Sequence, residues 1–158
     1  MASETFVFNI AKGRVGEYVN AVLAGGNDAI VWVPMNGSDE SAANGRDADT
    51  LAAVEALATF AEQTAGGWAR ITQDETGDGL TWTVDDTDDE GVADSNDLSF
   101  GSPTGGNNTV GLIACYDPDT TTGSDSDLIP LVHLVMNVTA DGNAVTYQHN
   151  AEGWYNAT

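Results

Sequence analysis

The residues whose types and spacing could do chemistry are concentrated in segment 117–127. Two pairs of alternating aspartates stand there: Asp117, Asp119, Asp125 and Asp127. Carboxylate oxygens along one side of a turn are the hard ligands that Ca²⁺ or another divalent cation prefers. An EF-hand loop needs glycine at its sixth position and glutamate at its twelfth, whereas here Gly123 is seventh and Leu128 is twelfth. The segment is therefore a candidate divalent-cation site, with a solvated loop between two strands as the competing interpretation.

A second acidic cluster, at residues 85–90, holds five carboxylates in six positions. It could attract a divalent cation weakly, but an acidic surface turn is the simpler interpretation. No other cofactor is indicated by the sequence.

Residues able to support catalysis are sparse. His133 and His149 lie in strand-like segments, and neither belongs to a recognisable motif. The chain has no Gly-x-Ser-x-Gly turn, no His-Glu-x-x-His and no phosphate-binding glycine loop. We therefore predict structural histidines, no catalytic residues, and a protein that is not an enzyme.

The aromatic residues could line a sugar-binding face, but core packing is the simpler explanation. Trp32, Trp68 and Trp82 stand inside apolar runs and are expected in the interior. Trp154 and Tyr155 follow a glycine near the end of the sequence, and we predict that this pair forms an assembly interface.

Two helices are expected in the first half of the chain. Over residues 9–24 the apolar side chains follow helical spacing, with Asn9 as a candidate N-cap and Gly25 at the end. Over residues 50–63 the same spacing follows an Asp49 or Thr50 cap.

The remaining apolar runs have the composition of strands, and clusters of Gly, Asp, Asn and Pro separate them. One run covers residues 29–34, and six more follow from residue 67 onwards: 68–72, 80–84, 98–100, 110–116, 130–138 and 144–148. The predicted fold is α+β and β-rich, an antiparallel sandwich or barrel-like sheet with two helices in the N-terminal half. The length of 158 residues indicates a single domain over 1–158.

The charge of the chain is extreme, with 25 Asp and Glu against 4 Lys and Arg, a formal net charge of -21. Such a surface repels phosphate backbones and anionic lipids, so we expect neither nucleic acid nor a membrane as partner. In molar salt the Debye length falls to about 3 Å, and carboxylates no longer repel one another beyond contact. The composition, with Lys12 as the one lysine, is therefore typical of a halophilic protein. The single cysteine, Cys115, needs no oxidising compartment, so we expect a chain made in the cytoplasm.

Five short motifs, in this order, carry a resemblance to a known family. They are NIAKGRV at 9–15, DTLAAV at 49–54, GWAR at 67–70, CYDPDT at 115–120 and DSDLIPL at 125–131. With this series the chain resembles small virion structural proteins of tailed viruses, of the capsid decoration or cement type. The acidic stretch 74–94 exceeds what such relatives need, which points to a virus of halophilic archaea.

This resemblance implies a location in the virion and a role in stabilising the capsid shell, with no catalytic residues to transfer. The implied partners are the major capsid protein and further copies of the chain, in a trimer or another cyclic oligomer. A tail or neck component, or a fibre-like adhesion module, is the alternative in the same class. From another class, a calcium-binding cytosolic halophilic protein using the 117–127 loop remains open.

Overall fold

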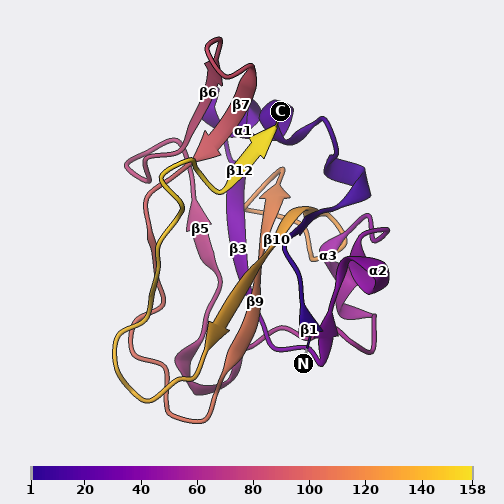
Figure 1. The fold of residues 1–158 in the computed structure, drawn as a ribbon, viewed down its shortest axis with the longest axis vertical. Coiled ribbons are helices and arrows are strands. Elements are labelled where there is room, and N and C mark those ends of the chain that lie inside the picture. Colours follow the sequence, from indigo (N-terminus) through magenta and orange to yellow (C-terminus); the bar gives the residue numbers. More distant parts are fainter. Residues whose placement is uncertain (1, 158) are drawn as a thin grey trace.

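The computed structural model describes residues 2–157, and its centre is a five-stranded antiparallel sheet (Figure 1). The strand order is β2-β10-β9-β3-β5. These strands span β2 (Phe6–Val7), β3 (Ala29–Met35), β5 (Ile71–Gln73), β9 (Thr109–Asp117) and β10 (Ile129–Val138). The long strands β3, β9 and β10 are the apolar runs that the sequence predicted as strands.

The central sheet is buried on both faces. Ile30 and Trp32 of β3 belong to one apolar cluster, whereas Val31 and Val33, which point to the opposite face, belong to a second cluster. This double burial explains why β3 is an unbroken apolar run rather than an alternating one.

Three smaller sheets surround the central one. β1 (Ala2–Ser3) pairs in parallel with β4 (Asp39–Glu40), and β8 (Leu98–Ser99) pairs antiparallel with β11 (Thr146–Tyr147). The third sheet has the order β12-β7-β6, from β6 (Thr81–Asp85), β7 (Glu90–Asp94) and β12 (Tyr155–Ala157). Apart from the parallel β1–β4 pair the sheets are antiparallel, and the architecture is α+β and β-rich, as the sequence predicted.

The first predicted helix is shorter than residues 9–24. A 3₁₀ turn, η1 (Asn9–Ala11), is followed by Gly13 at φ +72°, and only then does α1 (Val15–Leu23) begin. The left-handed backbone of Gly13 interrupts the helix, so Asn9 is not its N-cap. The end at Gly25 is confirmed, since its amide bonds to the carbonyl of Val22.

The second predicted helix, 50–63, is also wrong in length. α3 (Leu51–Glu55) begins after Thr50, whose hydroxyl accepts the amide hydrogen of Ala53 at 3.2 Å, so that cap is confirmed. The chain then leaves the helix, because residues 61–63 extend alongside the end of β3. The amide of Gln63 bonds there to the carbonyl of Pro34. A short helix, α2 (Ala42–Gly45), and a 3₁₀ turn, η2 (Ala65–Gly67), were not predicted.

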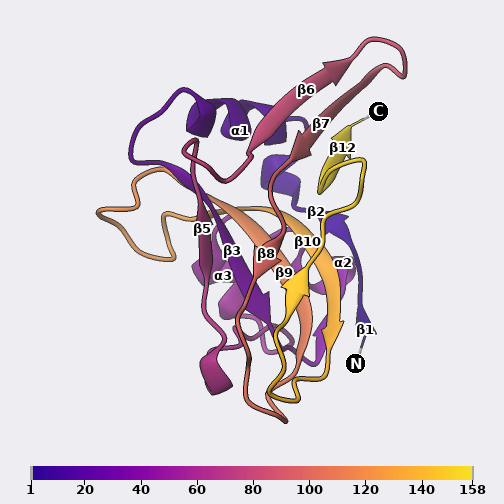
Figure 2. The ribbon, with the colours of Figure 1, turned by 90° about the vertical axis from the view of Figure 1, so that its left-hand side faces the viewer.

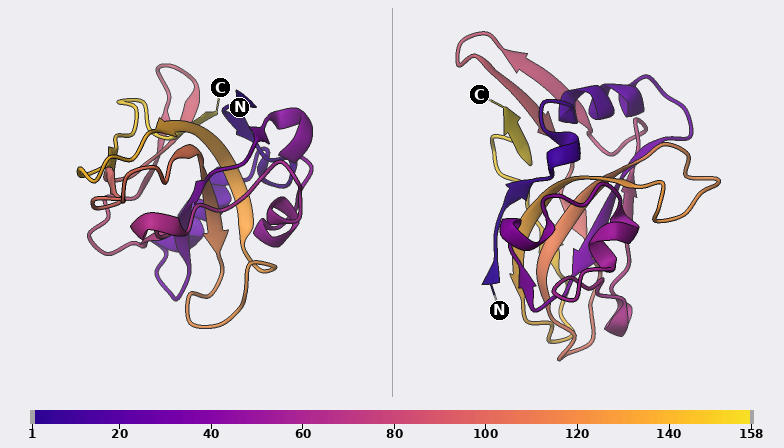
Figure 3. Two further views of the ribbon diagram at one scale, coloured as in Figure 1. Left: turned by 90° about the horizontal axis from the view of Figure 1, so that it is seen from below. Right: turned by 90° about the vertical axis from the view of Figure 1, so that its right-hand side faces the viewer.

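The helices lie on one face and at one end of the central sheet. α2 and α3 cover one face of the central sheet, while α1 lies at the end from which the β6–β7 hairpin projects (Figures 2 and 3). Within residues 2–157, no helix has the length and apolar character needed to cross a bilayer.

Candidate functional site

The aspartates of the 117–127 loop each have their own structural role. Asp117 and Asp127 accept backbone amide hydrogens of the same loop at 3.0 and 2.8 Å. Asp119 accepts two threonine hydroxyls at 2.6 Å, which hold the pKa of its carboxyl below the ordinary value. Asp125 instead pairs with Arg70. In the part of the chain that the structure describes, no three His, Cys, Asp or Glu side chains are placed to hold a metal ion, so the geometry gives the calcium hypothesis no support.

Arg70 lies at the centre of three carboxylates. Its guanidinium donates to Glu62 at 2.6 and 2.8 Å, to Glu55 at 3.2 Å, and to both oxygens of Asp125. These bonds join α3, the 60s segment and the 117–127 loop. An open pocket of about 350 Å³ lies beside Arg70 and Asp125. The cluster therefore fastens three segments together at the sheet edge.

The two sides of this cluster titrate differently. Hydrogen bonds from Arg70 hold the pKa of Asp125 below its ordinary value. Partial burial, with the nearby charge of Asp125, raises the pKa of Glu55 to about 7. The single positive charge of Arg70 offsets only part of the negative charge of the three carboxylates.

A second polar cluster is fully buried. His133 of β10 and Glu40 of β4 are both inaccessible to solvent, with Nε2 and Oε2 2.8 Å apart. His133 Nδ1 donates to the carbonyl of Glu4 at 2.7 Å, and the amide of Gly37 donates to the other oxygen of Glu40. The ring of Phe6 stacks on the imidazole at 5.2 Å. This network ties the N-terminal segment to the sheet, where no substrate could reach it.

His149 is the one histidine close to a serine hydroxyl. Its Nε2 lies 3.2 Å from the Oγ of Ser95, and burial lowers the pKa of the imidazole. A nucleophilic triad needs an accessible hydroxyl and a carboxylate on the other ring nitrogen. Ser95 is buried, and Nδ1 of His149 has no hydrogen-bond partner in the described chain. The arrangement packs His149 against Trp32, with the ring centroids 5.0 Å apart.

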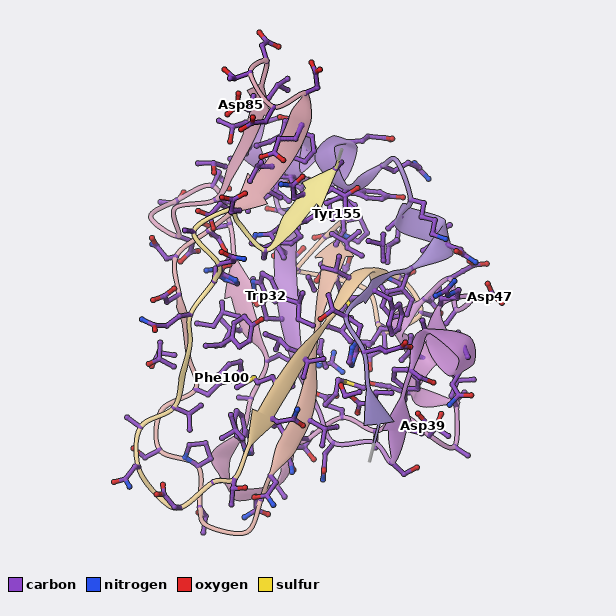
Figure 4. The ribbon with its side chains drawn as sticks, in the orientation of Figure 1. Trp32, Asp39, Asp47, Asp85, Phe100 and Tyr155 are labelled. Atoms are coloured by element: carbon purple, nitrogen blue, oxygen red, sulfur yellow. The ribbon has the colours of Figure 1, made fainter. Side chains whose placement is uncertain are left out.

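The predicted interface pair is divided between core and surface. Trp154 is buried and packs edge-on against Trp32, with the ring centroids 5.3 Å apart, so its indole stabilises the chain's own core. Tyr155 is only half-buried and lies in the third sheet (Figure 4). Its ring lies 6.4 Å from that of Trp82, at an interplanar angle of 27°. Trp82 is also half-buried, so the prediction that it lies in the interior was wrong.

The third sheet projects away from the body of the molecule. Figure 2 shows the β6–β7 hairpin extending beyond α1, and Figure 4 shows Asp85 at its far end. Among the described strands β6 pairs only with β7, which leaves its outer backbone edge unpaired. Val84 of β6 is 68% exposed, and no other large apolar side chain in the described chain is classed as exposed.

The base of the hairpin is fixed to the body by Trp82. Its ring lies so close to Gly16 of α1 and Gly91 of β7 that a Cβ added at either glycine would come within 2.5 Å of it. Beside Trp82 is an open notch of about 310 Å³, lined mainly by apolar atoms of Val15, Trp82 and Tyr155. We call the projecting hairpin, with the unpaired outer edge of β6 and the exposed Val84, the hairpin surface. The notch lies on the inner side of Trp82, between α1 and β12.

Comparison with known proteins gives no relative. No protein-family model matches the chain, and neither a curated protein sequence nor a solved structure matches it.

Sequence reasoning missed the hairpin surface although its pattern was visible. Residues 81–85 alternate Thr, Trp, Thr, Val and Asp directly before the acidic turn, which is the pattern of a strand with one solvated face. The close approach of Trp82 to two glycines depends on tertiary packing and has no sequence signal. The same holds for the His133 and Glu40 pair, which lie 93 positions apart.

Proposed function

We propose that the chain is a non-enzymatic structural protein of a virion, a capsid decoration protein of a tailed virus with a halophilic host. The observation that carries this proposal is the hairpin surface, which projects from the body and presents an unpaired strand edge with an exposed valine. Unpaired strand edges and exposed apolar side chains are the features through which β-proteins bind other proteins. The motif resemblance supplies the kind of partner, namely the major capsid protein and further copies of the chain.

The polar clusters support a structural role. Arg70 with its three carboxylates, the His133 and Glu40 pair, and the His149 and Ser95 contact each connect segments that are distant in sequence. Each therefore serves the rigidity of the scaffold, which a protein that reinforces a shell requires.

The distribution of charge along the chain indicates that an acidic partner would bind only in high salt. All four Lys and Arg residues lie in the first 70 positions, so the sequence after Arg70 is without either. A surface this acidic approaches another acidic protein only when salt screens the repulsion. A halophilic cytoplasm provides that screening.

One observation favours the alternative of a fibre-like adhesion module or tail component. An open pocket of about 430 Å³ is lined by Tyr147, Trp154 and Tyr155 together with amide and carboxylate side chains. Aromatic rings beside polar groups are suited to binding a neutral glycan. Binding of host-surface glycans by the purified chain, with loss on Tyr147→Ala, would favour this second function.

The proposal is tested by rebinding. Shells purified from a virus that lacks the gene are mixed with the purified chain in molar KCl and sedimented. We expect the chain to sediment with the shells, and a variant carrying Val84→Asp and Thr83→Asp to remain in solution. The control Asp49→Lys, a charge change in front of α3, should bind like the wild type. Failure of the folded wild-type chain to bind shells would contradict a decoration role.

A further inference from the structure

The two faces of the β6–β7 hairpin differ in character. Thr83 and Asp85 of β6 lie on one face together with Glu90 of β7, which is directly opposite Asp85 in the ladder. Trp82 and Val84 lie on the other face, because side chains alternate along a strand. There α1 packs near Trp82 and leaves Val84 exposed. Towards its tip the hairpin is therefore acidic on one face and apolar on the other.

The acidic face is hollowed into a groove of about 420 Å³, which lies between the hairpin and the turn at residues 151–152. Five carboxylate side chains contribute to its lining: Asp85, Asp86, Asp88, Glu90 and Glu152. None of them forms an ion pair within residues 2–157. The amide of Thr87 donates to Asp85 at 2.8 Å, which holds the pKa of that carboxyl below its ordinary value. Asp85 and Glu90 are thus like charges directly opposed, an unfavourable arrangement that a cationic group would relieve.

The outer edge of β6 is open to a further strand, because within residues 2–157 β6 pairs only with β7. An extended peptide binds such an edge by continuing the hydrogen-bonded ladder. Its side chains would alternate between the two faces. Those beside Thr83 and Asp85 would project over the acidic groove, and those beside Val84 would project on the apolar face. The edge therefore fits a strand with basic residues at every second position and apolar residues between them.

The chain itself does not supply such a strand. Only Lys12 and Arg14, among its four basic residues, are spaced two apart, and the folded chain holds them in the turn between η1 and α1. Arg46 follows α2, and Arg70 is bound by three carboxylates. The occupant that the charge selects is therefore a segment of another protein.

We propose that the outer edge of β6 binds an extended segment of a partner protein in which lysine or arginine alternates with apolar residues, with the basic side chains over the acidic groove and the apolar ones beside Val84. This inference rests on the proposed function and names the chemistry of the shell segment that the chain binds. A shell protein that is acidic as a whole would reach the hairpin through such a segment. In molar salt the charges attract only at contact distance, and backbone pairing with the apolar contact supplies the remaining affinity.

The first test mixes the purified full chain with a labelled synthetic peptide in which four lysines alternate with four valines. We expect binding, measured by fluorescence anisotropy, that weakens as KCl is raised above the lowest concentration at which the chain is folded. A peptide of four lysines followed by four valines should bind more weakly, and one that alternates glutamate with valine should not bind. Hydrogen exchange should slow in Thr81–Asp85. No binding of the alternating lysine peptide, equal binding of the block peptide, or protection elsewhere than on β6 would overturn the proposal.

The second test locates the peptide on the hairpin. Asp85→Asn combined with Glu90→Gln removes the opposed carboxylates and should raise the dissociation constant about fivefold. Val84→Ser should also raise it, without a change of charge. Asp49→Asn combined with Glu75→Gln removes the same two charges at exposed positions outside the hairpin and should leave it unchanged. Equal effects of the two double variants would show attraction to the net charge alone and would overturn the proposal.

Rebinding to shells separates this inference from the function on which it rests. Wild-type binding that the Asp85→Asn and Glu90→Gln double variant loses supports both. If the double variant binds shells as well as the wild type, the decoration role stands and the basic segment is overturned. If the folded wild type does not bind shells, the decoration role fails, and the peptide experiment alone decides the chemistry of the β6 edge.

Discussion

Among the carboxyl groups of the Arg70 cluster, Glu55 has the pKa that departs most from its ordinary value. Its pKa is raised to about 7 from 4.5, chiefly by partial burial and by the charge of Asp125. The folded chain therefore holds this proton more tightly than the unfolded chain does. The resulting stability is fully present below pH 4.5 and is lost as the pH rises through 7.

Glu55→Gln should remove this pH dependence. At pH 8 the variant should be more stable than the wild type, because a neutral amide still accepts from Arg70 but does not repel Asp125 or Glu62. At pH 5, where Glu55 is largely protonated, the two should be equally stable. Urea unfolding in molar KCl at both pH values provides the measurement. The difference between the two proteins isolates Glu55 from His149, whose lowered pKa acts in the opposite direction. A wild-type advantage at pH 8 would contradict this account.

Gly111→Ala tests the buried network. A Cβ at Gly111 would collide with the facing atoms of Glu40 and His133, neither of which has room to move. Overpacking of a buried site costs typically about 1–3 kcal/mol, so we expect the free energy of unfolding to fall by at least that amount. At Gly105 the same Cβ meets its nearest atom at 3.5 Å, so Gly105→Ala is the matched control. Equal stability of the two variants would contradict the tight packing around this pair.

At the scale of elements, a substitution at Gly16 tests whether Trp82 fixes the hairpin to α1, because helix propensity and packing predict opposite effects on stability. Gly16 lies within α1, where alanine is favoured over glycine by about 1 kcal/mol. A Cβ there would come within 2.5 Å of the Trp82 ring, so we expect Gly16→Ala to destabilise the chain instead. In a Trp82→Ala background the same change should stabilise it, which a double-mutant cycle of unfolding free energies measures. Stabilisation by Gly16→Ala in the wild-type background would show that the hairpin is not fixed in this way.

Strands could be predicted from this sequence better than helices. The long strands β3, β9 and β10 are buried on both faces and are continuous apolar runs, a local pattern that is independent of their partners. The helix predicted over 50–63 ended early because residues 61–63 bond to the end of β3, a contact that helical spacing cannot reveal. The helix predicted over 9–24 is broken by the left-handed backbone of Gly13, which the helical spacing of the apolar residues does not reveal.

The candidate site was less predictable than the fold. Tyr155 was selected from its position after a glycine and does lie half-exposed beside the notch. Trp154 was selected for the same reason but is buried, because its indole packs against Trp32. Four aspartates in one loop suggested a cation site. In the structure three of these aspartates accept hydrogen bonds within their own turns, and the fourth pairs with Arg70. The spacing of the four residues along the chain does not reveal these contacts.

At the scale of the whole molecule, stability should rise with salt. A net charge of -21 on 158 residues destabilises the compact state by self-repulsion in dilute buffer, and added KCl screens it. We expect the melting temperature to increase steadily from dilute to molar KCl. Replacing Asp85, Asp86, Asp88 and Asp89 by asparagine should reduce that slope. A melting temperature independent of salt would contradict the halophilic interpretation.

The central claim is that this chain is a structural component of a virion shell. The most direct measurement is quantitative mass spectrometry of particles purified from a halophilic host that carries the gene, with the chain counted relative to the major capsid protein. We predict a copy number of the same order as that of the major capsid protein. A few copies per particle would place the chain in the tail or neck, and its absence from purified particles would contradict the account.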